Sequence, residues 1–200
     1  MPRGWPVVGW AALAVGVMIA IILAIAGTGE DGVRMVIRAT ARSSVVLFTA
    51  AFVASSLRRR WPSAGTTWLL VNRRYLGVSF AVSHLAHFLA ILALAGWSFS
   101  RMAADAGWTV GILGGGAYLI IIAMTATSFD RTAAWLGPRA WQRLHALGVY
   151  WIWTVFAVSF VPRAFTSALY WPFALLLVVA LGVRLWPRAR VRGPVAAASA

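Results

Sequence analysis

The chain contains three histidines, and each lies within or at the start of a long apolar segment. His84 and His87 are three residues apart in LGVSFAVSHLAHFLAILALAGW, a spacing that places them on one face of a helix. His145 opens a second apolar segment, WQRLHALGVYWIWTVF. A neutral imidazole in hydrocarbon is costly unless a partner holds it. Histidines on two facing membrane helices commonly hold a heme iron, whose axial ligands set its potential, so the pattern predicts a heme site.

The composition is that of a membrane protein. Of 200 residues, 62% are hydrophobic and 11% charged, and the mean hydropathy is +0.82. A soluble domain has about a quarter of its residues charged, so the predicted class is an all-α polytopic membrane protein in contact with the lipid bilayer. Cysteine is absent from the chain, which excludes disulfides, thiolate-bound metals and iron–sulfur clusters. A redox centre must therefore use histidine or methionine as its ligand, or be supplied by another molecule.

The net charge of +14 comes entirely from arginine, because the chain contains no lysine. The arginines lie between apolar segments and not along one helix face, so we expect membrane topology and no nucleic-acid binding. If both termini share one side, that side holds 13 arginines and the other side 5. The positive-inside rule then places both termini of this multi-pass chain in the cytoplasm.

Six segments are apolar enough to be membrane spans of about 20 residues. They are approximately Pro6–Ala26, Ser43–Leu57, Tyr75–Phe99, Trp108–Thr127, Trp141–Val161 and Phe165–Trp186. The second is short, so we expect it to begin nearer Ile37. The first is longer than the apolar part of a signal peptide, which favours a retained span. We expect one six-helix domain over residues 1–186 and a disordered basic cytoplasmic tail over residues 187–200. Many of the 12 tryptophans lie near span ends, as in an aromatic belt.

The third and fifth spans run in the same direction, so residues early in each can face one another. Small residues, among them Gly77 in the third span and Gly148 in the fifth, leave room for a heme macrocycle between the two helices. Arg73, Arg74, Arg139 and Arg143 lie at the cytoplasmic ends of these spans, where arginine either sets the membrane topology or binds the heme propionates. With a rise of 1.5 Å per residue, His84 lies roughly 15 Å and His87 roughly 20 Å beyond Arg74, and His145 about 9 Å beyond Arg139. Depth alone favours His84 as the partner of His145. His87 is open as the partner if Arg74 begins the helix below the membrane surface.

Other interpretations use the same residues differently. Zinc could be held by His84, His87 and His145 with water as the fourth ligand, but no carboxylate lies in any span to complete that site. His145 could be an interfacial histidine that binds no metal. The chain as a whole could be a heme-free membrane scaffold or a small transporter with a hinge in the fourth span at Gly114, Gly115 and Gly116. Absence of colour in the pure protein would favour this last class.

Four ordered stretches carry a family resemblance over roughly residues 38–160. They are T40-A-R-S-S with L57-R-R-R, N72-R-R-Y-L-G-V-S-F-A-V-S-H-L-A-H, A126-T-S-F and L136-G-P-R-A-W-Q-R-L-H-A-L-G-V-Y. The chain resembles the ferric reductase-like transmembrane domain family, and within it the heme-binding membrane subunits of bacterial periplasmic methionine sulfoxide reductase systems. The family's third-span histidine falls on His87 and its W-x-x-L-H histidine on His145. His84 has no clear counterpart.

The resemblance implies a six-helix b-type cytochrome, the redox-active subunit of an oxidoreductase system and not a complete enzyme. Electrons would come from a cytoplasmic flavin reductase or the quinone pool, with FMN or quinone as the carrier, because the chain has no nucleotide-binding loop of its own. They would pass to a periplasmic molybdopterin methionine sulfoxide reductase or to ferric iron. The arginines at the cytoplasmic face, Arg74 and Arg143 among them, could hold the cofactor or dock a donor.

The chain departs from the family at one position. Many members carry another histidine thirteen residues after the one matched by His145, and here that residue is Val158. A second heme would therefore lack its obvious ligand, and we expect one heme b held by His145 and by either His87 or His84.

Overall fold

The computed structural model describes residues 1–187, apart from the side chains at positions 109 and 110, and the expected tail lies outside the described residues from position 188 onward. Every regular element in the described part is a helix. Five segments are long and apolar enough to cross a membrane, namely α1 (Trp5–Ala26), α2 (Glu30–Arg60), α4 (Arg73–Leu94), α7 (Pro138–Ala164) and the last segment, in which η1 (Ala168–Tyr170) leads into α8 (Trp171–Leu185). This confirms an all-helical protein with five candidate membrane spans, and α5 is a sixth candidate if its bent halves count as one span.

Helix α5 (Phe99–Ala126) differs from the predicted fourth span because it is bent. Gly107 has φ 68°, in the left-handed region that glycine adopts at little cost. The chain direction bends by 119° between the segments Phe99–Trp108 and Gly111–Ala126. The straight part reaches the expected end, close to Thr127.

Helix α2 is much longer than its apolar segment suggests. It has 31 residues, a length of about 46 Å, and begins at Glu30. Arg34 pairs with Glu30 at 2.6 Å, and the guanidinium of Arg42 lies over the rings of Tyr170 and Phe173. Because these arginines have their own partners, the helix continues past the polar positions that break the hydropathy pattern.

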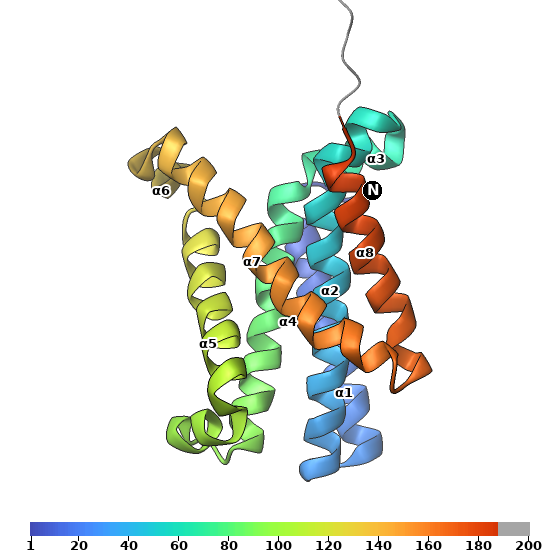
Figure 1. The fold of residues 1–200 in the computed structure, drawn as a ribbon, viewed down its shortest axis with the longest axis vertical. Helices are drawn as coiled ribbons and strands as arrows, with labels where there is room; N and C mark the ends of the chain where they lie inside the picture. The colour runs from blue at the N-terminus through green and yellow to red at the C-terminus, as the bar shows by residue number, and fades with distance from the viewer. Residues whose placement is uncertain (188–200) are drawn as a thin grey trace, which may run out of the picture.

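Two short helices, α3 (Ala64–Val71) and α6 (Asp130–Leu136), lie at one end of the bundle (Figure 1). We call this the arginine-rich end, because Arg58–Arg60 and Arg73–Arg74 lie there. A capping box between Ser63 and Thr66 starts α3. Both ends of the described chain also lie here, since the Trp68 indole donates to the Pro2 carbonyl at 2.7 Å and Arg60 donates to the Pro187 carbonyl at 2.8 Å.

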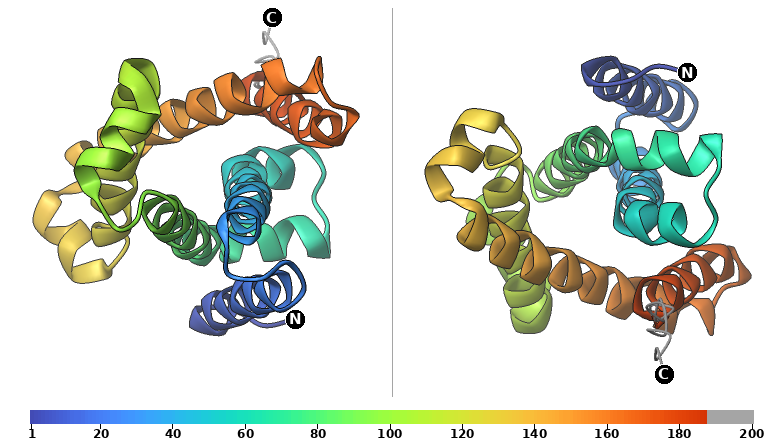
Figure 2. Two further views of the ribbon diagram at one scale, coloured as in Figure 1. Left: turned by 90° about the horizontal axis from the view of Figure 1, so that it is seen from below. Right: turned by 90° about the horizontal axis from the view of Figure 1, so that it is seen from above.

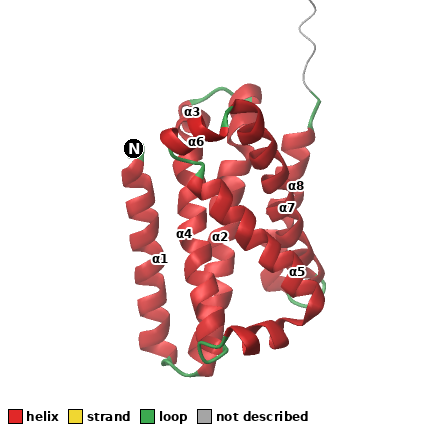
Figure 3. Cartoon of the chain, turned by 90° about the vertical axis from the view of Figure 1, so that its left-hand side faces the viewer, coloured by secondary structure: helices red, strands yellow, loops and turns green. Residues whose placement is uncertain are grey.

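Helices α2 and α4 lie between α1 on one side and α7 on the other (Figure 2). Helix α1 stands at the edge of the bundle, and most of its residues are not buried inside it (Figure 3). Helix α7 crosses the bundle obliquely and packs on α5 and α8. The core joins aromatic side chains of α2, α4 and α7, including Phe48, Phe52, Phe80, Phe156 and Phe160.

Gly148 is the point of closest approach between α7 and α5. A Cβ added there would clash with the sulfur of Met124 and lie 2.9 Å from the Ile120 side chain. The sequence suggested that Gly148 makes room for a macrocycle, but its free face is already filled by α5. Its role is therefore close helix packing.

Gly148→Ala is expected to destabilise the protein by about 1–3 kcal/mol through overpacking. The midpoint of thermal unfolding in detergent, followed by circular dichroism, would measure this. Gly182→Ala is the matched control, because a Cβ on that α8 residue meets no atom within 4 Å. An equal midpoint for the two variants would contradict the packing role of Gly148.

Candidate functional site

The α4 histidine pair, His84 and His87, lies well inside the bundle. Their rings stack with centroids 5.2 Å apart. The His84 ring also packs on aromatic rings of three helices, with centroids 5.3 Å from Phe80, 5.0 Å from Tyr118 and 5.7 Å from Phe156. The stacked rings show that the two histidines share one helix face, as predicted, and His84 lies where α4 meets α5 and α7.

His87 is held by hydrogen bonds to α2. Its Nδ1 lies 3.0 Å from the Ile37 carbonyl oxygen and 3.2 Å from the Thr40 hydroxyl. The hydroxyl hydrogen is directed to the Val36 carbonyl at 2.7 Å, and a carbonyl can only accept. Nδ1 must therefore carry the ring hydrogen and donate it, which leaves the lone pair on Nε2 free. Metal-ligating histidines are oriented in this way, by donating the other ring N–H to a carbonyl.

The stretch Thr40-Ala-Arg-Ser-Ser provides more of this α2–α4 contact. The Ser83 hydroxyl on α4 lies 2.8 Å from that of Ser43 and 3.0 Å from that of Ser44. Ser44 and Ser83 are fully buried. The sequence marked this stretch only as part of a family resemblance, and the structure shows that it fixes the α4 face carrying the histidines. Its signal was the run of small hydroxyl residues inside a predicted span.

His84 has a different environment. Its Nδ1 is buried and has no hydrogen-bond partner within residues 1–187. A buried polar atom without a partner is uncommon in folded proteins and needs an explanation. In a neutral imidazole one nitrogen donates its N–H and the other accepts a hydrogen bond or binds a metal, so Nδ1 is either an N–H without an acceptor or a nitrogen open to a ligand.

His145 lies near the arginine-rich end, on the first turns of α7. Its ring stacks on Trp141 with centroids 4.1 Å apart, and its Nε2 lies 3.2 Å from the Thr127 hydroxyl. The same Thr127 donates its hydroxyl hydrogen to the Ala123 carbonyl at 2.7 Å and accepts the Trp141 indole at its own carbonyl at 2.9 Å. Thr127, in the A126-T-S-F stretch, thus orients both rings from the end of α5.

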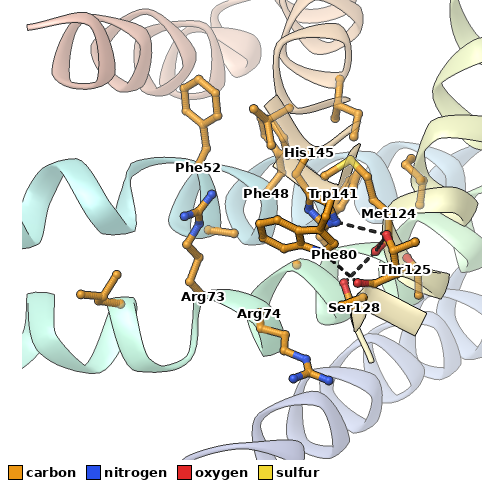
Figure 4. Close-up of a pocket in the computed structure, with 18 of the residues that line it drawn as sticks. Phe48, Phe52, Arg73, Arg74, Phe80, Met124, Thr125, Ser128, Trp141 and His145 are labelled. Atoms are coloured by element: carbon orange, nitrogen blue, oxygen red, sulfur yellow. Dashed lines mark hydrogen bonds between the residues drawn. The ribbon is translucent and has the colours of Figure 1, made fainter. Parts of the chain in front are cut away.

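His145 opens into a cavity of about 430 Å³ between α2, α4, α5 and α7, which we call the His145 cavity. A cavity of this size is in the range of sites for cofactors. Apolar side chains form its walls, and Arg73 and Arg74 lie to one side (Figure 4). The residues that shape it include Phe48, Phe80, Gly77, Ile121, Met124, Trp141 and Val149.

The arginines expected at the cofactor divide into two groups. Arg73 and Arg74 line the His145 cavity; Arg74 also pairs with Asp130 at 2.6 Å, and Arg73 donates to the Ser55 hydroxyl at 3.1 Å. Arg139 and Arg143 are exposed and are not among the cavity-lining residues. Any anionic group in the cavity would therefore meet arginines of α4 and not those of α7.

The structure brings His84 and His87 together but does not bring His145 to them. His84 packs on Phe156, which follows His145 by eleven positions on α7, or about 16 Å along that helix. Within residues 1–187, no three histidine or acidic side chains are placed to share one metal ion. The geometry therefore gives the zinc interpretation no support. It places the candidate ligands at two levels, His145 near the arginine-rich end and the α4 histidine pair deeper in the bundle.

The donor set and its surroundings fit a heme. The His87 Nε2 is free, the His84 Nδ1 is unpartnered, and His145 lines an apolar cavity with arginines beside it. Flat aromatic and aliphatic walls suit a macrocycle, and arginine suits its carboxylates. Val158, at the position of the further histidine, is half exposed, and the α7 residue that meets His84 is Phe156.

Two proteins of known name are similar to this chain. The protein-methionine-sulfoxide reductase heme-binding subunit MsrQ of Azospira oryzae is 32% identical over 142 residues, which cover 66% of this chain and 58% of the relative. The subunit of the same name from Ralstonia nicotianae is 28% identical over 169 residues, covering 79% of this chain and 73% of the relative. No family model matches the chain. No solved structure matches it either.

The match therefore spans less than two thirds of the length of the Azospira protein. Both relatives bear the same name, and that name specifies heme binding, in agreement with the resemblance carried by the histidine stretches. The resemblance of the chain to the heme-binding subunits of methionine sulfoxide reductase systems is thus confirmed by its similarity to two MsrQ proteins.

Proposed function

We propose that this protein is a heme b-containing electron-transfer subunit of the ferric reductase-like type in the bacterial inner membrane, with both termini cytoplasmic. The observation that carries the proposal is the His145 cavity. It is a mainly apolar space of about 430 Å³, and one imidazole and two arginines line it. The similarity to MsrQ heme-binding subunits supports it. The 13-to-5 distribution of arginines supports the orientation, since the arginine-rich end would be cytoplasmic.

In this proposal the side chains of the cavity have separate tasks. His145 is oriented by Trp141 and donates its Nε2–H to Thr127, so it would bind the iron through Nδ1. Arg73 and Arg74 would hold the carboxylates. The aromatic walls would keep water away. When bound, heme supplies one-electron chemistry at a potential that its ligands and surroundings set.

The α4 histidine pair is the second proposed ligand position. The sequence alone favours one iron held by His145 and by His87 or His84. The separation of about 16 Å along α7 instead supports two independent ligand levels. At the deeper level, His87 is better oriented than His84 to bind iron. Its Nδ1–H is hydrogen-bonded to the Ile37 carbonyl, and its Nε2 is free.

The proposed donors are a cytoplasmic flavin reductase, with FMN as the carrier, or a membrane quinol. The proposed acceptors are a periplasmic molybdopterin methionine sulfoxide reductase, which the relatives' name suggests, and ferric iron. The basic surface of the arginine-rich end suits an acidic cytoplasmic flavoprotein. A genomic neighbour encoding a molybdopterin reductase would favour the first acceptor.

The optical spectrum of the detergent-purified protein tests the function. We expect a Soret band, reduced bands of heme b after dithionite, and at least about one heme per chain by pyridine hemochrome assay, because one cavity and one deeper histidine pair are available. A content of about one would mean that a single level is occupied, and about two would mean both. No Soret band after expression with a heme precursor would contradict the proposal and favour a heme-free scaffold or transporter.

A further inference from the structure

A second cavity, of about 260 Å³, lies between four helices at the arginine-rich end. Its lining comes from α2, α4, α7 and α8, and consists of polar or charged residues, namely Ser55, Ser56, Arg59, Arg73, Tyr150 and Arg184. We call it the arginine cavity. It is a separate space from the His145 cavity, although Arg73 lines both.

Each of the three guanidinium groups makes one hydrogen bond to the protein. Arg59 donates to the Ser56 hydroxyl at 3.2 Å, Arg73 donates to the Ser55 hydroxyl at 3.1 Å, and Arg184 donates to the Phe52 carbonyl at 2.6 Å. A guanidinium has five N–H donors, so most of them are left for another acceptor. The Nε of Arg184 is buried and lacks a partner within residues 1–187.

Among the described residues, no acidic side chain lines the arginine cavity to balance the three positive charges. The whole chain has only four acidic residues. Glu30 pairs with Arg34 and Asp130 with Arg74, while Asp31 lies in the first turn of α2, at the opposite end of that helix from Arg59, and Asp105 lies before the α5 bend. Three cations that share one partly enclosed space repel one another, so the site favours an anion from outside the chain.

The place of the arginine cavity in the fold indicates the source of that anion. Arg59 and Arg184 lie in the last turns of α2 and α8, and Arg73 begins α4, so all three are where proposed spans leave the hydrocarbon. Arg59 and Tyr150 are exposed, which opens the cavity to the surroundings. Phospholipid phosphates lie at this depth, and basic pockets between membrane helices bind anionic headgroups.

We propose that the arginine cavity binds the phosphate of an anionic phospholipid headgroup, with Arg59, Arg73 and Arg184 as its donors. Guanidinium groups match phosphate geometry by paired N–H donors, and the Tyr150 and serine hydroxyls add neutral donors. The bound lipid would join α2, α4, α7 and α8 where the bundle has no ion pair between them among the described residues. Arg59 and Arg184 do not line the His145 cavity, so their part in lipid binding can be tested separately from heme binding.

Native mass spectrometry of the full chain in mild detergent, titrated with phosphatidylglycerol, tests the site. Wild-type protein is expected to retain phosphatidylglycerol in preference to zwitterionic phosphatidylcholine. Arg59→Gln and Arg184→Gln should each weaken retention about fivefold. Arg58→Gln is the matched control, since it removes an arginine charge from the same helix end outside the cavity lining, and it should leave retention unchanged.

Three outcomes would overturn the assignment. The first is equal phosphatidylglycerol retention by Arg59→Gln and wild type, a comparison that is informative because Arg59 is exposed and its replacement should not prevent folding. The second is displacement of the lipid by inorganic phosphate at similar concentration, which would assign the site to a soluble phosphate. The third is loss of heme from the arginine variants with unchanged lipid retention, which would assign the cavity to a heme carboxylate.

Discussion

His145→Ala is expected to reduce binding of the heme that we propose for the His145 cavity about tenfold or more. Loss of a partner that merely orients a metal-binding histidine costs about 10–100-fold in affinity, so loss of the ligand itself should cost at least as much. Among the residues that line the cavity, His145 is the single imidazole. Heme per chain by pyridine hemochrome assay, with the oxidised and reduced spectra, would measure the loss.

Two further measurements separate loss of a ligand from loss of folding. Added imidazole should restore part of the lost Soret absorbance in His145→Ala, because the deleted side chain leaves space for it beside Trp141. Gln142→Ala is the matched control, since Gln142 is exposed one turn earlier on the same helix. Heme content equal to wild type in His145→Ala would remove His145 from the ligand set.

The helical membrane class and most span positions could be predicted from the sequence, because long apolar segments require membrane-spanning helices. The true start of α2 could not, since Arg34 and Arg42 obtain partners from Glu30 and from rings of the last span that hydropathy does not detect. The bend of α5 rests on one backbone angle at Gly107. The capping box at Ser63 and Thr66 was a readable signal for α3 that the span analysis passed over.

The candidate ligands could be named from the sequence, but not their grouping. Composition and spacing identified His84, His87 and His145, and the helix period placed the first two on one face. Their depth was estimated by counting residues from the arginines, which treats the spans as parallel. Helix α7 crosses obliquely and brings Phe156, not His145, to the His84 ring. The levels of two helices depend on their crossing angle, which side-chain packing determines and residue counting cannot provide.

His87→Ala is expected to change the heme spectrum more than His84→Ala. The two histidines stack on each other in the same helix, so their replacements are closely matched in size and depth. They differ in how their rings are oriented. The Ile37 carbonyl and Thr40 hold the His87 ring with its Nε2 free, whereas no hydrogen bond to Nδ1 orients His84. A pre-oriented ligand loses less freedom on binding, which favours His87 as the iron ligand. Spin state by optical and electron paramagnetic resonance spectra would compare the variants, and an equal or larger change in His84→Ala would reverse the assignment.

The double variant His87→Ala/His145→Ala then decides how many irons these histidines serve. Residues that act on one centre are strongly non-additive, whereas independent sites add. Because the His84 ring of the α4 histidine pair meets α7 at Phe156, about 16 Å along that helix from His145, we expect the two losses of heme signal to add. If the double variant loses no more heme signal than His145→Ala alone, then α4 and α7 hold one iron between them. That result would require the bundle to close around the heme.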